Sequence, residues 1–174
     1  MNRLVIGIDN GLSGAIVVLA PSNLDVLYKT FMPLKGKKDR EVCVNGLDAF
    51  FAEIHFAELP LIAIEECPHH ASQMSTMRSM AFTCGKLISY LEKRFPGAQI
   101  VRVAPGNSKS NGWQYAMLGP KIPKGQTKQY ALEASKKFWP VETWSGATKA
   151  EREGMIDAAL IAVFVMRKLS KKQN

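Results

Sequence analysis

Three short apolar segments separated by turn residues open the chain. Residues 4–8 form an apolar run that ends at Asp9, and residues 10–14 are typical of a tight turn. Residues 15–20 are apolar again, and residues 24–32 alternate well enough to predict a third strand. Because tight turns join consecutive strands in antiparallel pairs, we expect a three-stranded antiparallel sheet here.

Helical and strand patterns alternate through the rest of the chain. Apolar spacing predicts helices around residues 45–54, 72–95, 126–138 and 149–169. Leu61–Glu65 and residues 99–104 are typical of strands, whereas residues 105–125 form a long irregular stretch rich in Gly, Pro, Ser, Asn and Lys. Strands separated by helices run parallel through right-handed crossovers. The predicted fold class is therefore α/β, with a mixed five-stranded sheet, three antiparallel strands and then parallel ones, and helices on both faces.

The helix predicted over residues 72–95 carries an apolar stripe on one face. Its members recur at three- and four-residue steps: Met74, Met77, Ala81, Cys84, Ile88 and Leu91. The stripe packs either on this chain's own sheet or on a second copy, and the sequence leaves both open. Gly85 beside it predicts the close approach of another backbone, because glycine is otherwise a poor helix former.

Composition indicates one globular domain. The 174 residues suffice for a single core, and residues 168–174 are expected to be a frayed tail. No apolar run is long enough to span a bilayer, and the N-terminus lacks a signal-peptide layout, so we expect a cytoplasmic location and no membrane partner. Cys43, Cys67 and Cys84 are expected to be free thiols in a reducing compartment.

The net charge of +8 favours a polyanionic partner, nucleic acid first and an anionic membrane surface second. A merely basic soluble protein is the alternative. Residues 35–40 form a basic loop, which is either a solvated linker or a DNA contact. His69 and His70 follow Cys67 but match no paired zinc motif, so we expect them to be exposed or to help bind DNA.

Three acids stand at the edges of apolar elements. Asp9 ends the first strand, Glu65 ends the strand expected to lie beside it, and Asp157 lies in an apolar helical segment. Taken singly, Asp9 can cap a turn and Asp157 can pair with Arg152 or Arg102. Taken together, the acids predict a site for Mg²⁺ or Mn²⁺, which prefer carboxylate oxygens.

A pair of such ions about 3.5–4 Å apart stabilises the attacking and leaving oxygens of a phosphodiester displacement. One ion helps to deprotonate a water and the other stabilises the departing 3′ oxygen. Glu153, four residues before Asp157, lies on the same helix face and extends the cluster. In a basic protein this chemistry indicates a nuclease.

These segments resemble the RuvC-type Holliday-junction resolvases, in particular their divergent phage and organellar branch. The matching segments are Gly7-Ile8-Asp9-Asn10-Gly11-Leu12-Ser13-Gly14-Ala15, Ala63-Ile64-Glu65 and Ile156-Asp157-Ala158-Ala159-Leu160-Ile161-Ala162, with a weaker match over residues 128–140. The resemblance implies one RNase H-like nuclease domain over residues 1–174 and a homodimer. It also implies Mg²⁺-dependent nicking of four-way DNA junctions by paired symmetric cuts, with two ions in each active site.

The resemblance assigns the role of metal ligand to Asp9, Glu65 and Asp157, with Glu66 as the alternative to Glu65. Many members place a fourth acid three residues before the last aspartate, where this chain has Gly154, so Glu153 is chosen instead. Residues 105–125 depart from the family's Pro-x-x-Trp-Lys pattern, which leaves the equivalence of Trp113 open. The expected DNA contacts are Arg78, Lys109, Lys121, Lys124 and Lys128.

Three other classes fit part of the sequence. Other RNase H-like nucleases of branched DNA or flaps share the fold and its acids. The first motif also resembles a phosphate loop of the actin and sugar-kinase superfamily of ATP-binding proteins, but those need two lobes and give Glu65 and Asp157 no role. A non-catalytic DNA-binding module that keeps the fold is the remaining alternative.

Overall fold

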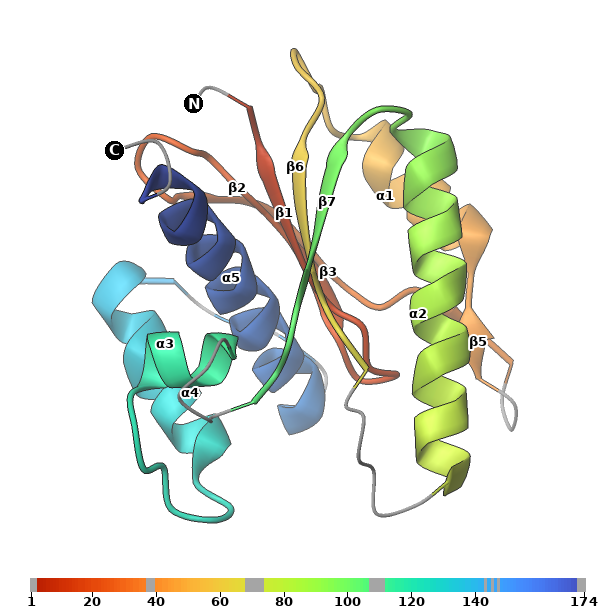
Figure 1. Cartoon of the computed structure of the whole chain (residues 1–174). Helices are drawn as coiled ribbons and strands as arrows, with labels where there is room; N and C mark the ends of the chain where they lie inside the picture. The colour runs from red at the N-terminus through yellow and green to blue at the C-terminus, as the bar shows by residue number, and fades with distance from the viewer. Residues whose placement is uncertain are drawn as a thin grey trace.

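A mixed five-stranded sheet forms the centre of the molecule in the computed structural model (Figure 1). The structure describes residues 3–36, 40–67, 74–106, 112–142, 144, 146 and 148–171. The sheet consists of β1 (Val5–Asp9), β2 (Ala15–Leu19), β3 (Val26–Phe31), β6 (Leu61–Glu65) and β7 (Gln99–Val103). Their spatial order is β3-β2-β1-β6-β7.

The pairing of the strands confirms the predicted fold class. β1, β2 and β3 pair antiparallel, and β6 pairs parallel with β1 on one side and with β7 on the other. β1 is therefore the central strand, with β6 beside it, as expected from the sequence. This places the ends of the first and fourth predicted strands at the same edge of the sheet.

Helices cover both faces of the sheet (Figure 1). One face carries α1 (Val44–Ala52) and α2 (Met74–Arg94). The other carries α5 (Lys149–Ser170), with α3 (Trp113–Leu118) and α4 (Thr127–Phe138) packed around it. α5 continues through Ser170, so it includes the first residues of the segment expected to be a frayed tail.

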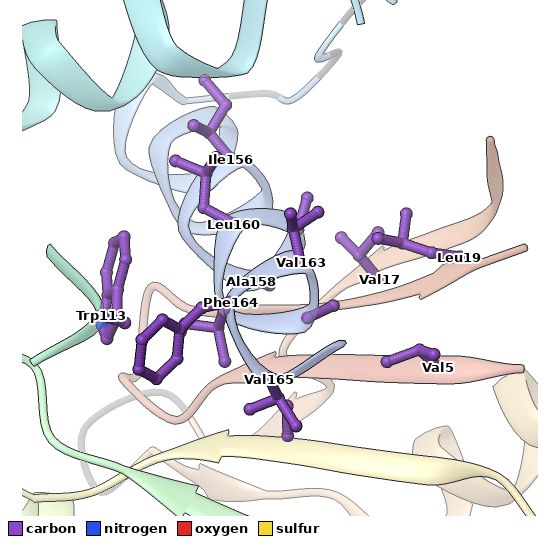
Figure 2. Close-up of a cluster of buried hydrophobic side chains, with 14 of the residues drawn as sticks. Val5, Val17, Leu19, Trp113, Ile156, Ala158, Leu160, Val163, Phe164 and Val165 are labelled. Carbon is purple, nitrogen blue, oxygen red and sulfur yellow. The ribbon is translucent and has the colours of Figure 1, made fainter. Parts of the chain in front are cut away.

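Alternation along the strands divides the core into two layers, because successive side chains point to opposite faces of a sheet. In β1, Ile6 and Ile8 face α1 and α2, whereas Val5 faces α5. Residues 154–165 of α5 are buried throughout. Figure 2 shows this helix against Val5, Val17 and Leu19 of the strands, with Trp113 beside it.

The structure departs from the sequence-based expectations in two loops. The basic loop expected over residues 35–40 belongs in part to a small second sheet, in which β4 (Leu34–Lys35) pairs antiparallel with β5 (Glu41–Val42). The stretch expected to be irregular over residues 105–125 contains α3, because Trp113 is fully buried and packs in the α5 layer.

The apolar stripe predicted on α2 divides between two environments. Ile88 and Leu91 are buried in the sheet core and Cys84 is half-buried, but Ala81 is exposed. The side chains of Met74 and Met77 lie outside what the structure describes. A Cβ added at Gly85 would meet nothing within 4 Å in the described part of the chain, so no close backbone approach is found there.

Two further expectations concern the thiols and the membrane. Cys43, Cys67 and Cys84 are free, as predicted. Within the described ranges, no helix combines the length and the apolar character that a membrane crossing needs.

Candidate active site

The ends of β1 and β6 carry two of the predicted site residues. The parallel register sets Ile8 opposite Ile64, and Asp9 and Glu65 follow directly at the same end of their strands. α5 lies across this part of the sheet and carries Asp157, which is only 6% exposed. Three acids from distant parts of the sequence thus share one region.

Two glycines allow α5 to lie this close. A Cβ at Gly7 would fall 2.0 Å from the carbonyl oxygen of Ala158, so β1 and the helix backbone touch at this point. A Cβ at Gly154 would fall 2.5 Å from the carbonyl oxygen of Ser13, in the turn that follows β1. Both contacts are with backbone atoms, which leave no room for a side chain.

Hydrogen bonds hold the acids on β1 and β6. The indole Nε1 of Trp113 donates to Oε1 of Glu65 at 2.7 Å, and the Nδ2 of Asn10 donates to the backbone oxygen of Glu65 at 2.6 Å. The backbone N–H of Gly11 donates to Oδ1 of Asp9 at 3.1 Å. The Glu65 carboxylate is therefore oriented by a residue of α3, an element that the sequence did not predict.

Asp157 is paired with a lysine. The Nζ of Lys128, in the first turn of α4, lies 2.5 Å from Oδ2 of Asp157. The other oxygen, Oδ1, is buried and has no hydrogen-bond partner among the described residues. The arginine pairing considered from the sequence is not what the structure shows, because Arg152 donates to the backbone oxygen of Gly146.

The acids interact electrostatically. The pKa of Glu65 is raised to about 8, chiefly by burial and also by the charges of Asp9 and Asp157, which together outweigh the lowering effect of the Trp113 hydrogen bond. Burial likewise raises the pKa of Asp9, and raises that of Asp157 to about 6. Such crowding of buried carboxylates is costly unless a cation compensates it.

Lys128 supplies part of that compensation. Burial lowers the pKa of its ammonium, but the charges of Asp157, Asp9 and Glu153 outweigh burial, so the net pKa is raised. The ammonium is thus a permanent positive charge among the acids. The sequence placed Lys128 among the expected DNA contacts and gave no sign of this pairing, because its partner is 29 residues away in the chain.

Glu153 lies one helical turn before Asp157 and is half-buried, with Oε1 3.7 Å from the Nζ of Lys149. Its charge acts on both Asp157 and Lys128, so it belongs to the same electrostatic cluster. The contact between Gly154 and the turn after β1 explains why position 154, one residue after Glu153, carries no acidic side chain.

For the choice between Glu65 and Glu66, the hydrogen-bond pattern favours Glu65. The Glu65 carboxylate interacts with Trp113 and with the charge of Asp9. Glu66 continues the sheet through its backbone N–H, which donates to Val103. Because side chains alternate along an extended segment, the two carboxylates leave opposite faces.

The donor set fits a divalent cation, although no formed cage is present. Among the residues that the structure describes, no three His, Cys, Asp or Glu side chains lie close enough together to hold an ion. The suitability of these residues for a divalent cation rests on the buried, unpartnered Oδ1 of Asp157 and on the raised pKa values of Asp9 and Glu65. Oxygen donors of this kind match hard cations such as Mg²⁺.

The remaining predicted DNA contacts lie outside this cluster. Arg78 is exposed on α2, and Lys121 and Lys124 are exposed between α3 and α4. Lys109 and the two histidines, His69 and His70, lie outside the described residues. The sequence assigned no site role to Asn10, although Asn10 lies in a segment that resembles the resolvases, and it left the role of Trp113 open.

Comparison with known proteins identifies the class of fold. Neither a protein-family model nor a curated protein matches the chain. Among solved structures, T. thermophilus RuvC in complex with Holliday junction substrate is similar, with a TM-score of 0.58 and 11% sequence identity. The match covers 95% of this chain and 96% of that chain. The fold is therefore RNase H-like and shared with that protein along nearly the whole chain.

Proposed function

We propose that this protein is a Mg²⁺-dependent endonuclease that resolves four-way DNA junctions by paired symmetric nicks. The observation that supports the proposal is that Asp9 and Glu65 end neighbouring parallel strands and that the charges of Asp9 and Asp157 both act on the buried Glu65. The net charge of +8 and the similarity of the fold to a junction-bound RuvC support it. Phosphodiester hydrolysis assisted by metal ions needs oxygen ligands and a basic surface together.

In this proposal Asp9, Glu65, Asp157 and Glu153 hold a pair of Mg²⁺ ions, for which Mn²⁺ can substitute. The bound ions supply an activated water and charge stabilisation at the phosphate. Water then adds to phosphorus, the bond to the 3′ oxygen breaks, and that oxygen leaves with a proton. Trp113 acts by orienting the Glu65 carboxylate, and the N–H of Gly11 does the same for Asp9.

Basic side chains bind the DNA backbone in this account. The proposed contacts are Arg78, Lys109, Lys121, Lys124 and Lys128. Phosphate contacts position the substrate without reading its sequence, so we expect binding to weaken steeply with salt.

A homodimer provides the second active site that paired cutting needs. The outward side of α2 carries Phe82, which is 64% exposed, beside Ala81 and the open position at Gly85. We propose that this face joins two copies. A two-fold dimer presents two identical sites to a junction with approximate two-fold symmetry.

The direct test is cleavage of labelled four-way junction, flap and linear duplex, with and without Mg²⁺. The wild type is expected to cut the junction at paired positions only with the metal, whereas Asp9→Asn and Asp157→Asn should bind it without cutting. Loss of several kcal/mol of metal stabilisation corresponds to at least about a 10³-fold slower rate.

Other results of this cleavage assay would favour other classes of protein. Equal cutting of flaps indicates a general nuclease of branched DNA, and junction binding without cleavage in Mg²⁺ or Mn²⁺ indicates a binding module. ATP hydrolysis without DNA cleavage favours the actin and sugar-kinase alternative. Loss of junction binding in both variants would contradict the assigned roles.

A further inference from the structure

The ammonium of Lys128 is paired with the Asp157 carboxylate, which is a proposed ligand of the metal ion. It lies 2.5 Å from Oδ2 of Asp157, so that oxygen already interacts with a positive charge. A divalent ion at the same oxygen would sit against the ammonium, and two cations at such a separation repel strongly in a partly buried site. The ion pair at Oδ2 therefore weakens the binding of a metal ion by this carboxylate.

Lys128 has space to move away. Its side chain is 47% exposed, compared with 9% for Asp157, so the lysine is the partner with solvent space around it. It also borders a groove of about 850 Å³ between α4, the segment around Trp144 and the start of α5. Arg152 and Lys149 line the same groove, which gives it a basic wall beside Glu153.

We propose that Lys128 couples DNA binding to metal binding. In the absence of DNA its ammonium occupies Asp157 and weakens metal binding. When a DNA phosphate lies along the site, the ammonium transfers from Asp157 to the phosphate, and the freed carboxylate binds the divalent ion. This inference rests on the proposed function. It adds an order of binding, because the complete metal site forms only when DNA is bound.

The coupling must be reciprocal, because each ligand changes the affinity of the other by the same factor. Couplings of this kind are commonly about 5- to 150-fold. Lys128 acts here as a positioning residue, and its role is measurable without any cleavage.

The test is Ca²⁺ affinity by titration calorimetry, with and without four-way junction, the junction being checked for intactness on a denaturing gel. Lys128→Met should bind Ca²⁺ about 5- to 150-fold more tightly than the wild type without DNA. Junction DNA should raise the affinity of the wild type by a larger factor than that of Lys128→Met. Lys128→Arg keeps the charge and should behave as the wild type does.

Lys136→Met is the matched control, because it removes the same charge from an exposed position of the same helix. Its Ca²⁺ affinity should equal that of the wild type. Unchanged or weaker Ca²⁺ binding in folded Lys128→Met would overturn the coupling while leaving the proposed function intact. Absence of Ca²⁺ binding from every protein, with junction as well as without, would overturn both.

Discussion

The two oxygens of Asp157 meet different surroundings, and this asymmetry defines the site at the residue scale. One oxygen is paired with an ammonium, and the other is buried without a partner. Glu65 is held by an indole N–H, and Asp9 by a backbone N–H. Neutral donors thus orient Glu65 and Asp9, whereas Asp157 is held by the cation of Lys128, whose charge acts on all three carboxylates.

The hydrogen bond from Trp113 predicts a role in metal binding. Trp113→Phe keeps an aromatic ring but removes the donor to Glu65, so we expect metal affinity to fall about 10- to 100-fold, as for other residues that orient a metal ligand. Calorimetric titration with Mn²⁺ measures it.

Trp139→Phe is the control, since the Nε1 of Trp139 donates to the backbone oxygen of Leu24, away from the acids. It should lower stability and leave Mn²⁺ affinity unchanged. Equal affinities for the wild type and Trp113→Phe would contradict the assigned role of the indole.

The raised pKa of Glu65 predicts how the stability of the metal-free protein depends on pH. In the unfolded chain Glu65 ionises near the ordinary pKa of 4.5 for a glutamate, whereas in the folded protein its pKa is about 8. Between these values the folded state binds more protons, so the free energy of unfolding should fall as pH rises, and level off above about pH 8.

The measurement is urea unfolding between pH 5 and 8 in the presence of a chelator, for the wild type and Glu65→Gln. The wild type should lose a few kcal/mol, on the order set by the pKa difference, and the variant should lose much less. Parallel curves for the two proteins would show that Glu65 ionises normally.

Sequence reasoning at this scale found the acids but missed their neighbours. Asp9, Glu65 and Asp157 stand out because each acid adjoins an apolar run. Asn10, Trp113 and the pairing of Lys128 depend on contacts between distant segments, and no local pattern reports them. The roles of the four acids as metal ligands stay predictions.

At the scale of elements, the close contact between α5 and β1 positions the site. Gly7 and Gly154 allow it, and the apolar residues of α5 pack on β1 and β2 (Figure 2). The capping box at the start of α5, in which Thr148 and Glu151 bond each other's backbone, fixes where the helix begins. The position of Asp157 along the helix follows from that start.

Gly154→Ala tests this contact. The added Cβ would overlap backbone atoms of Ser13 and Gly14, so we expect a loss of about 1–3 kcal/mol or more in the free energy of unfolding. Chemical denaturation measures it.

Ala150→Ser, at an exposed position of the same helix, is the control and should stay within about 0.5 kcal/mol of the wild type. Equal stability of Gly154→Ala and the wild type would show that α5 does not pack this tightly on the turn after β1.

Most elements were predictable from sequence because their apolar spacing is local. β6 was predicted at its observed bounds, Leu61–Glu65, and β1, β2 and the long helices to within a few residues. The β4–β5 pair is too short to show a period, and α3 is a six-residue helix in a stretch full of turn residues. The burial of Trp113 stabilises α3, and that burial is a tertiary effect.

At the scale of the whole molecule, the sheet of this basic chain separates α5 on one face from α2 on the other (Figure 1). Asp9 and Glu65 end neighbouring strands of that sheet, and the outward face of α2 carries the exposed Phe82. Pairing through α2 would set the distance between two active sites. Ala81→Glu and Phe82→Glu place charge on that face and should convert dimers to monomers in sedimentation velocity.

Leu27→Glu is the control for this prediction. Leu27 is also an exposed apolar side chain, 46% exposed, but it lies on the edge strand β3 and not on α2. It should leave the dimer unchanged. A monomeric wild type, or dimers that persist in both α2 variants, would contradict the proposed interface.

The central claim is that acids from β1, β6 and α5 bind divalent metal together. Anomalous diffraction from Mn²⁺-soaked crystals of Lys128→Met, in which no ammonium pairs with Asp157, tests it most directly, because it locates the metal without reference to activity. We predict a peak in contact with the carboxylates of Asp9, Glu65 and Asp157. A map with no peak among these three side chains, at Mn²⁺ concentrations that label other sites, would contradict the account.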